Sequence, residues 1–207
     1  HGGWHVTGDI RFASKANLLG RYFQGELTTW PNPPGTLFDL RKYLASTSDI
    51  LPHLLHEHQV GFTNRVIEAV YQTRARLHAG GGRLGAADRA VLDELAAGLV
   101  RYVLFADEAP LPAPVAADRA FAADFQRGKR AAADGKSLRD LDLRTRLFRH
   151  RCSYMIYSSH WNAMPSVFRE RVYAKLRDAL QERAAGEYGY LPASEKRDIR
   201  RIIKATM

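Results

Sequence analysis

The chain has 207 residues, of which 45% are hydrophobic and 26% charged, and its mean hydropathy is −0.35. These values are typical of a globular protein with a substantial core, and no run reaches the roughly 18 apolar residues of a membrane-spanning helix, so such a helix is excluded. Cys152 is the only cysteine, which excludes an intrachain disulfide, a cysteine zinc site and covalent haem attachment through CxxCH.

The net charge of +9 is concentrated in the last two fifths of the sequence. Residues 1–126 carry 12 lysines and arginines against 13 aspartates and glutamates, whereas residues 127–207 carry 19 against 9. Such an asymmetry indicates an acidic partner, a phosphate-rich surface or a well-solvated face, and the last of these is the commonest.

The N-terminal quarter is rich in glycine and proline and predicts short, irregular elements. Residues 1–13 predict an irregular arm, and short helices are expected over 15–23, capped by Ser14, and over 34–43. Between them the proline-rich TTWPNPPGT can only be a loop. Because the chain begins with His1 and no leader sequence follows, we expect it to start after processing or inside a longer protein.

Residues 50–78 predict one long helix that forms the centre of the fold. Asp49 is placed to cap it, and Pro52 lies in the first turn, where proline is tolerated. Gly61 is its only internal glycine, and we expect no break there. The glycines of AGGG at 79–82 end the helix, because consecutive glycines are costly in any helix.

Four later segments show the apolar spacing of helices: 86–105, 137–148 with a cap at Ser137, 164–180, and 193–207 with a cap near Ser194. Residues 115–136 predict a weak helix followed by a loop, and RCSYMIYSS at 151–159 could form a strand. The sequence therefore predicts an all-α or mainly α fold. We expect a single helical domain over 1–207, a bundle around the central helix with proline-rich loops.

Residues 53–59, HLLHEHQ, place three histidines and a glutamate within two helical turns. On a wheel of about 100° per residue, His58 falls in the apolar stripe, and His53 and His56 fall on the opposite side. The three therefore cannot surround one metal ion. His53 and Glu57 share a face and could begin a metal site, but no second ligand pair or HExxH motif accompanies them, so a solvated polar face is the better interpretation.

A histidine within an apolar stripe must be hydrogen-bonded or bind something, because an unsatisfied buried imidazole costs about 1–3 kcal/mol. Two interpretations of His58 stay open: a core histidine bonded to Glu57, Gln59 or a tyrosine of another helix, and an axial metal ligand or acid–base group. Arg65 is predicted to point roughly inward as well. If the chain binds a cofactor, His58, Arg65 and Tyr154 are the residues predicted to contact it.

The segment RTRLFRHRCSYMIYSSHW at 144–161 interleaves arginines with aromatic residues. Such a composition could contact single-stranded nucleic acid, but no nucleic-acid-binding motif supports that interpretation. The alternative is a core segment in which Tyr154 and Tyr157 are buried and the arginines lie outside or pair with Asp140 and Asp142. We therefore do not expect nucleic acid as the partner.

Four segments stand out within residues 40–180: TSDILPHLLHEHQVGFTNR, YVLFADEAPLP, SLRDLDLRTRLFRHRCSYMIYS and NAMP. Together they resemble an uncharacterised family of exported bacterial proteins that occurs alongside c-type haem modules. The resemblance implies a periplasmic or otherwise extracytoplasmic location and a redox neighbourhood, and it assigns no catalytic residue.

Taken together, these features predict an extracytoplasmic helical domain linked to haem or electron transfer. It would either hold a non-covalent haem or dock against a c-type cytochrome or the rest of a longer chain. The alternative is a non-catalytic helical module whose basic C-terminal part binds an acidic partner. A third interpretation, an enzyme with His58 as its acid–base group, lacks a visible nucleophile or carboxylate pair.

Overall fold

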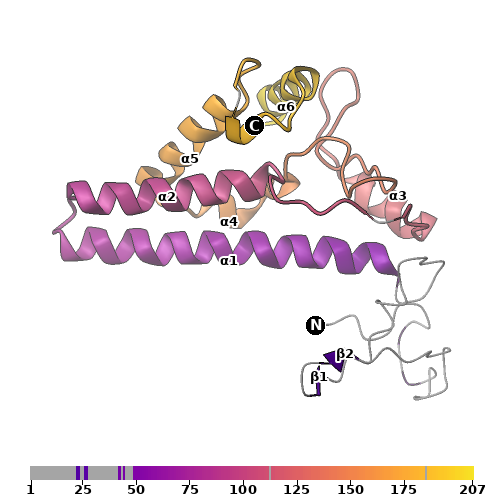
Figure 1. Cartoon of the computed structure of the whole chain (residues 1–207), viewed down its shortest axis with the longest axis horizontal. Helices are drawn as coiled ribbons and strands as arrows, with labels where there is room; N and C mark the ends of the chain where they lie inside the picture. The colour runs from indigo at the N-terminus through magenta and orange to yellow at the C-terminus, as the bar shows by residue number, and fades with distance from the viewer. Residues whose placement is uncertain are drawn as a thin grey trace. The chain divides into compact units, whose positions relative to one another are not determined.

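The computed structural model describes residues 22–23, 26–27, 42, 44, 49–111, 113–184 and 186–207. These residues are mainly helical, which confirms the predicted all-α class (Figure 1). The elements in chain order are β1 (Tyr22–Phe23), β2 (Glu26–Leu27), α1 (Ile50–Ala79), α2 (Ala86–Val103), α3 (Arg119–Arg127), the 3₁₀ helix η2 (Tyr154–Tyr157), α4 (Ser159–Asn162), α5 (Ser166–Ala179), the 3₁₀ helix η3 (Gly186–Tyr188) and α6 (Ala193–Thr206).

The described residues group into two compact units. The first contains those up to Glu57 together with 109–128 and 141–147, and the second contains 58–108, 129–140 and 148–207. Helix α1 contributes residues to both units. A single domain would require the two units to behave as one cooperative body, and the single-domain expectation stays a prediction.

Helix α1 is continuous from Ile50 to Ala79, as predicted, and passes through Gly61 without a break. The Asp49 carboxylate accepts a hydrogen bond from Leu51 N at 3.3 Å, which supports the first turn. At the other end Gly81 and Gly82 adopt positive φ angles of 58° and 86°. Gly82 N donates to Leu77 O at 2.7 Å, so glycine closes the helix in the left-handed conformation that other residues rarely adopt.

The first unit has a small apolar core of its own. Ile50 and Val115 are buried in it, and partly buried apolar residues pack around them: Leu54, Leu111, Ala117 and Leu143. Strands β1 and β2 pair antiparallel, so the helix predicted over 15–23 is wrong at its last two residues. The other residues of that helix, the arm over 1–13 and nearly all of the helix predicted over 34–43 lie outside the described residues.

The second unit is built on α2, which lies antiparallel to α1 and also contacts α5 (Figure 1). Arg76 of α1 and Asp88 of α2 form an ion pair at 3.6 Å. The apolar sides of α2 and α5 are buried, with Leu92, Ala96, Leu99, Val100 and Val103 from α2 and Phe168, Val172, Leu176 and Ala179 from α5. Phe62 of α1 stacks on Trp161 of α4 at 6.3 Å between ring centroids. The predicted helices over 86–105, 164–180 and 193–207 are therefore confirmed, although α6 begins after Pro192 and Ser194 is not its cap.

The helix predicted over 137–148 is wrong, because this segment forms successive turns. The Asp140 carboxylate accepts from Ser137 N at 2.8 Å, and the Asp142 carboxylate accepts from Thr145 N at 2.9 Å. Leu143 has a positive φ of 57°. Short acidic side chains that bond nearby backbone N–H groups offer the chain an alternative to the helical ladder, and here that alternative prevails.

The strand considered for 151–159 is also wrong, because η2 and the start of α4 occupy that segment. Ser153 Oγ accepts from Met155 N at 3.1 Å, and Ser158 Oγ accepts from Trp161 N at 3.2 Å. These two serines begin short helices in a segment whose apolar residues alone suggested a strand. Among the described residues, no helix has both the length and the apolar character needed to cross a bilayer.

Candidate functional site

His58 lies inside the second unit, as the helical wheel predicted, with 7% of its surface exposed. A hydrogen bond of 2.7 Å joins its Nε2 to Ser153 Oγ, and Tyr102 Oη donates to the His58 carbonyl at 3.0 Å. Ser153 was not among the partners predicted for the imidazole, which were Glu57, Gln59 or a tyrosine of another helix. Gln59 instead donates to Tyr154 Oη at 2.7 Å, and the Glu57 side chain is exposed.

Aromatic rings surround the His58 imidazole. Phe105 and Tyr102 stack on it at centroid distances of 4.7 and 5.4 Å, while Phe148 and Tyr154 lie at 5.9 and 6.1 Å. Burial lowers the pKa of His58 from 6.5 to about 4, because the charged form loses its hydration. The imidazole is therefore neutral at physiological pH.

This arrangement favours the interpretation of His58 as a satisfied core histidine. An axial haem ligand needs a ring nitrogen that is free to bind iron and room beside it for a flat macrocycle. Nε2 of His58 is already bonded to Ser153, and four aromatic rings lie within 6.1 Å of the imidazole. With Nε2 bonded and these rings around the imidazole, the arrangement fits a core histidine better than a haem ligand, and ligation by His58 stays a prediction.

The other residues predicted to contact a cofactor differ in position. Arg65 is exposed, so its predicted inward direction is wrong. Its guanidinium lies 4.0 Å from the centroid of the Tyr102 ring, and its Nη1 donates to Gly61 O at 3.0 Å. Tyr154 is buried, as expected for a core segment. Burial raises the pKa of the Tyr154 phenol, and the hydrogen bond from Gln59 offsets part of this effect.

His53 is half-buried, whereas His56 and Glu57 are exposed. Within the described part of the chain, no three His, Cys, Asp or Glu side chains gather as they would around a metal ion, so the spacing of His53 and Glu57 gains no third ligand there. Cys152 is buried, and burial raises the pKa of its thiol. A buried, protonated thiol is a poor nucleophile.

The exposed side of α6 carries four cationic side chains, which we call the basic face: Arg197, Arg200, Arg201 and Lys204. Their spacing of three or four residues places them on one side of the helix. The opposite side is buried, with Lys196, Ile199 and Ile202. The sequence indicated positive charge over 127–207 but did not single out this side of this helix.

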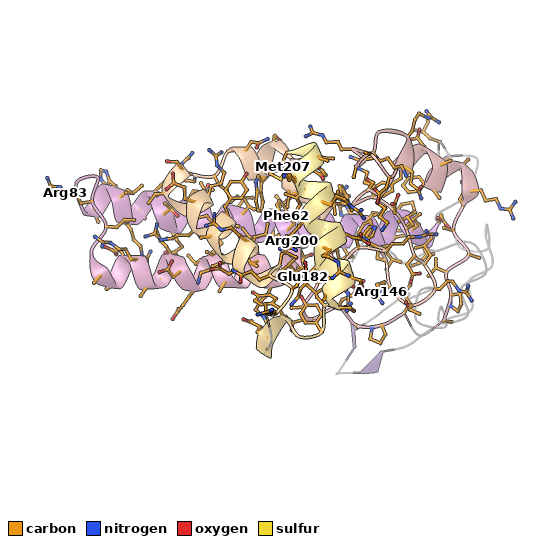
Figure 2. The ribbon with its side chains drawn as sticks, turned by 90° about the horizontal axis from the view of Figure 1, so that it is seen from above. Phe62, Arg83, Arg146, Glu182, Arg200 and Met207 are labelled. Atoms are coloured by element: carbon orange, nitrogen blue, oxygen red, sulfur yellow. The ribbon has the colours of Figure 1, made fainter. Side chains whose placement is uncertain are left out.

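Acidic side chains of α6 itself and of other segments lie among the cations of the basic face. Glu182, in the turn after α5, accepts hydrogen bonds from Arg197 Nη1 at 2.8 Å and from Arg200 Nη2 at 2.7 Å. Figure 2 labels Glu182 and Arg200 beside each other along α6. Asp198 pairs with Lys136 at 2.7 Å and also with Arg201. Asp134 also contacts Arg201 at 2.8 Å, so Lys136 and the four cations of the basic face meet three acidic groups.

Contacts along its length fix α6 to the rest of the second unit. Arg151 and Glu195 form an ion pair with 2.6 Å between Nη2 and Oε2, and Arg151 N also donates to Glu195 at 2.8 Å. At the other end, 2.6 Å separates Tyr157 Oη from Thr206 Oγ1. The buried Lys196 Nζ donates to the Ala184 carbonyl at 2.6 Å. The backbone that carries the basic face is therefore held in one position.

Comparisons of the chain with protein-family models, with curated proteins and with solved structures found no match.

Proposed function

We propose that the chain is a helical interaction module that binds an acidic protein partner through the basic face of α6. The observation that carries the proposal is four exposed cations on one side of a helix whose two ends are fixed to the second unit. A surface whose charges are already positioned loses less side-chain and backbone freedom on binding. Its positive potential also accelerates encounter with an acidic surface.

The resemblance described above extends this proposal to an extracytoplasmic setting linked to electron transfer. A c-type cytochrome with an acidic surface would be one such partner, and docking to it requires no haem within this chain. An absorption spectrum of the purified protein tests the separate possibility of bound haem, because a Soret band would reveal it.

The proposal is tested with a fluorescent glutamate-rich peptide whose anisotropy reports binding to the full chain. We expect binding to weaken between about 50 and about 200 mM salt, because ions screen charges beyond about 8 Å at physiological ionic strength. Replacing all four residues of the basic face by glutamine should weaken binding by at least about tenfold.

The control replaces four exposed arginines elsewhere in the second unit by glutamine, namely Arg74, Arg83, Arg89 and Arg177. It removes the same total charge from other surfaces. Equal losses in the two variants would attribute binding to net charge and contradict a site on α6. Binding that ignores salt would contradict the proposal altogether.

A further inference from the structure

We propose, on the basis of the function proposed above, that Glu182 is a built-in competitor for the acidic partner. Its carboxylate fills a clamp formed by Arg197 and Arg200, and a carboxylate of the partner replaces it on binding. The basic face would then exist in two states: closed on Glu182, or open toward the partner.

The first support is the geometry of the clamp. Oε2 of Glu182 accepts from Arg197 and Oε1 accepts from Arg200, so each carboxylate oxygen bonds one arginine. The arginines stand three residues apart on α6, whereas Glu182 belongs to the turn after α5. Two guanidinium groups that together hold both oxygens of one carboxylate form a receptor for that group.

The second support is exposure. The side chains of Arg197, Arg200 and Glu182 are 55%, 44% and 39% exposed. An exposed ion pair exchanges readily, because water competes for its charges and the side chains lose freedom to maintain it. An incoming carboxylate can make the same two hydrogen bonds that Glu182 makes. Exchange therefore costs few contacts, and the apparent affinity equals the affinity of the open clamp multiplied by the fraction of clamps that are open.

The third support concerns the class of partner. Asp198 and Asp134 both contact Arg201, so acidic groups interrupt the cations of this surface. A nucleic-acid backbone carries closely spaced phosphates and would meet those acids at several points. A protein segment with spaced glutamates or aspartates can place its carboxylates at the arginines and avoid Asp134 and Asp198. The clamp thus fits an acidic protein segment.

The decisive experiment compares Glu182→Gln with wild type in the same peptide titration. Removing the competing charge should raise the affinity about 3- to 10-fold, as expected if Glu182 closes about 70–90% of the clamps. Glu182→Asp, with a shorter reach to the two arginines, should give an intermediate gain. Because Glu182 is exposed, both variants should fold, and circular dichroism checks this.

The matched control is Glu187→Gln. Glu187 lies close in sequence and pairs with Arg101 of α2 rather than with an arginine of the basic face. The Glu187→Gln substitution removes the same charge as Glu182→Gln and should change the affinity for the peptide by less than about twofold. If wild type binds the peptide and the Glu182 and Glu187 variants bind it with equal affinity, Glu182 is not a competitor. The proposed function would then still stand. Absence of binding by wild type and by Glu182→Gln would overturn both. Tighter binding of a duplex DNA oligonucleotide than of the peptide would overturn the partner class.

Discussion

The His58 side chain is neutral because its surroundings cannot hydrate a charge. Its neighbours are aromatic rings and the hydroxyl of Ser153, and burial lowers its pKa to about 4. In the unfolded chain an imidazole titrates near its ordinary value of about 6.5. The folded protein therefore binds the proton more weakly than the unfolded chain does, and folding stability must depend on pH.

We expect the free energy of unfolding to fall as the pH is lowered from about 6.5 to about 4, because only the unfolded chain takes up the proton at residue 58 in that range. Above that range the contribution of His58 is complete. Losing the whole contribution of His58 lowers the free energy of unfolding by about 3 kcal/mol at most, because each unit of pKa difference is worth about 1.4 kcal/mol. Urea unfolding of wild type and His58→Gln at several pH values measures it.

The difference between the two proteins isolates His58, because His150, whose pKa burial also lowers, is present in both. Parallel stability curves for wild type and His58→Gln between pH 7 and pH 4 would contradict this expectation.

At the same scale, the sequence predicted which histidine of HLLHEHQ is buried but not what it bonds. The helical wheel reports the side of a helix that faces inward, and His58 lies within that stripe. Ser153, its partner, is 95 residues away, and no local pattern links the two. Arg65 sits near the edge of the stripe, and its long side chain reaches the surface over Tyr102. Glu182 belongs to a turn, where spacing carries no directional information.

Helices were predictable where apolar periodicity decided the structure and not where side chains bonded the local backbone. Helices α1, α2, α5 and α6 each bury one side against neighbouring segments, and their periods were visible in the sequence. The segment over 137–148 has similar apolar spacing, yet Asp140 and Asp142 capture its N–H groups. Sequence periodicity does not weigh such local bonds against a helix.

The contact between α1 and α2 depends on a missing side chain at Gly61. A Cβ there would lie 2.2 Å from Tyr102 Oη and 2.8 Å from Tyr102 Cζ. Tyr102 cannot move freely, because its hydroxyl bonds the His58 carbonyl and its ring stacks on the imidazole. We expect Gly61→Ala to lower the free energy of unfolding by about 1–3 kcal/mol, the usual cost of overpacking.

Gly98→Ala in α2 is the control. Gly98 is exposed, and nothing lies within 4 Å of a Cβ built on it. Alanine there should raise the free energy of unfolding by about 0.5–1 kcal/mol, because alanine loses less backbone entropy than glycine in a helix. Denaturant unfolding compares the two variants. If both substitutions raise the free energy of unfolding, Tyr102 can move aside for the new Cβ without an energetic penalty.

For the whole molecule, the two compact units have separate apolar cores, and these can differ in stability. The core of the first unit rests on Ile50 and Val115. Val115 N also donates to Leu143 O at 2.7 Å, which ties two segments of the first unit together. Local unfolding of one unit would appear as a distinct set of exchanging amides.

We expect Val115→Ala to weaken the first unit by about 1–3 kcal/mol through the cavity that it leaves. Hydrogen exchange should then accelerate within residues 49–57, 109–128 and 141–147, while the amides of α2 and α5 keep their rates. An equal acceleration in both units would show one cooperative domain over the described residues, as the sequence suggested. The experiment therefore tests the single-domain prediction.

The buried position of Cys152 has a practical consequence. It is the sole thiol of the chain, and none of it is exposed in the folded second unit. Toward alkylating reagents the folded protein should behave as if it contained no cysteine, since attack requires an accessible thiolate. A cysteine introduced at an exposed position of α6 would then be the site that takes a fluorophore or spin label. Slow alkylation of Cys152 itself would time the spontaneous opening of the second unit.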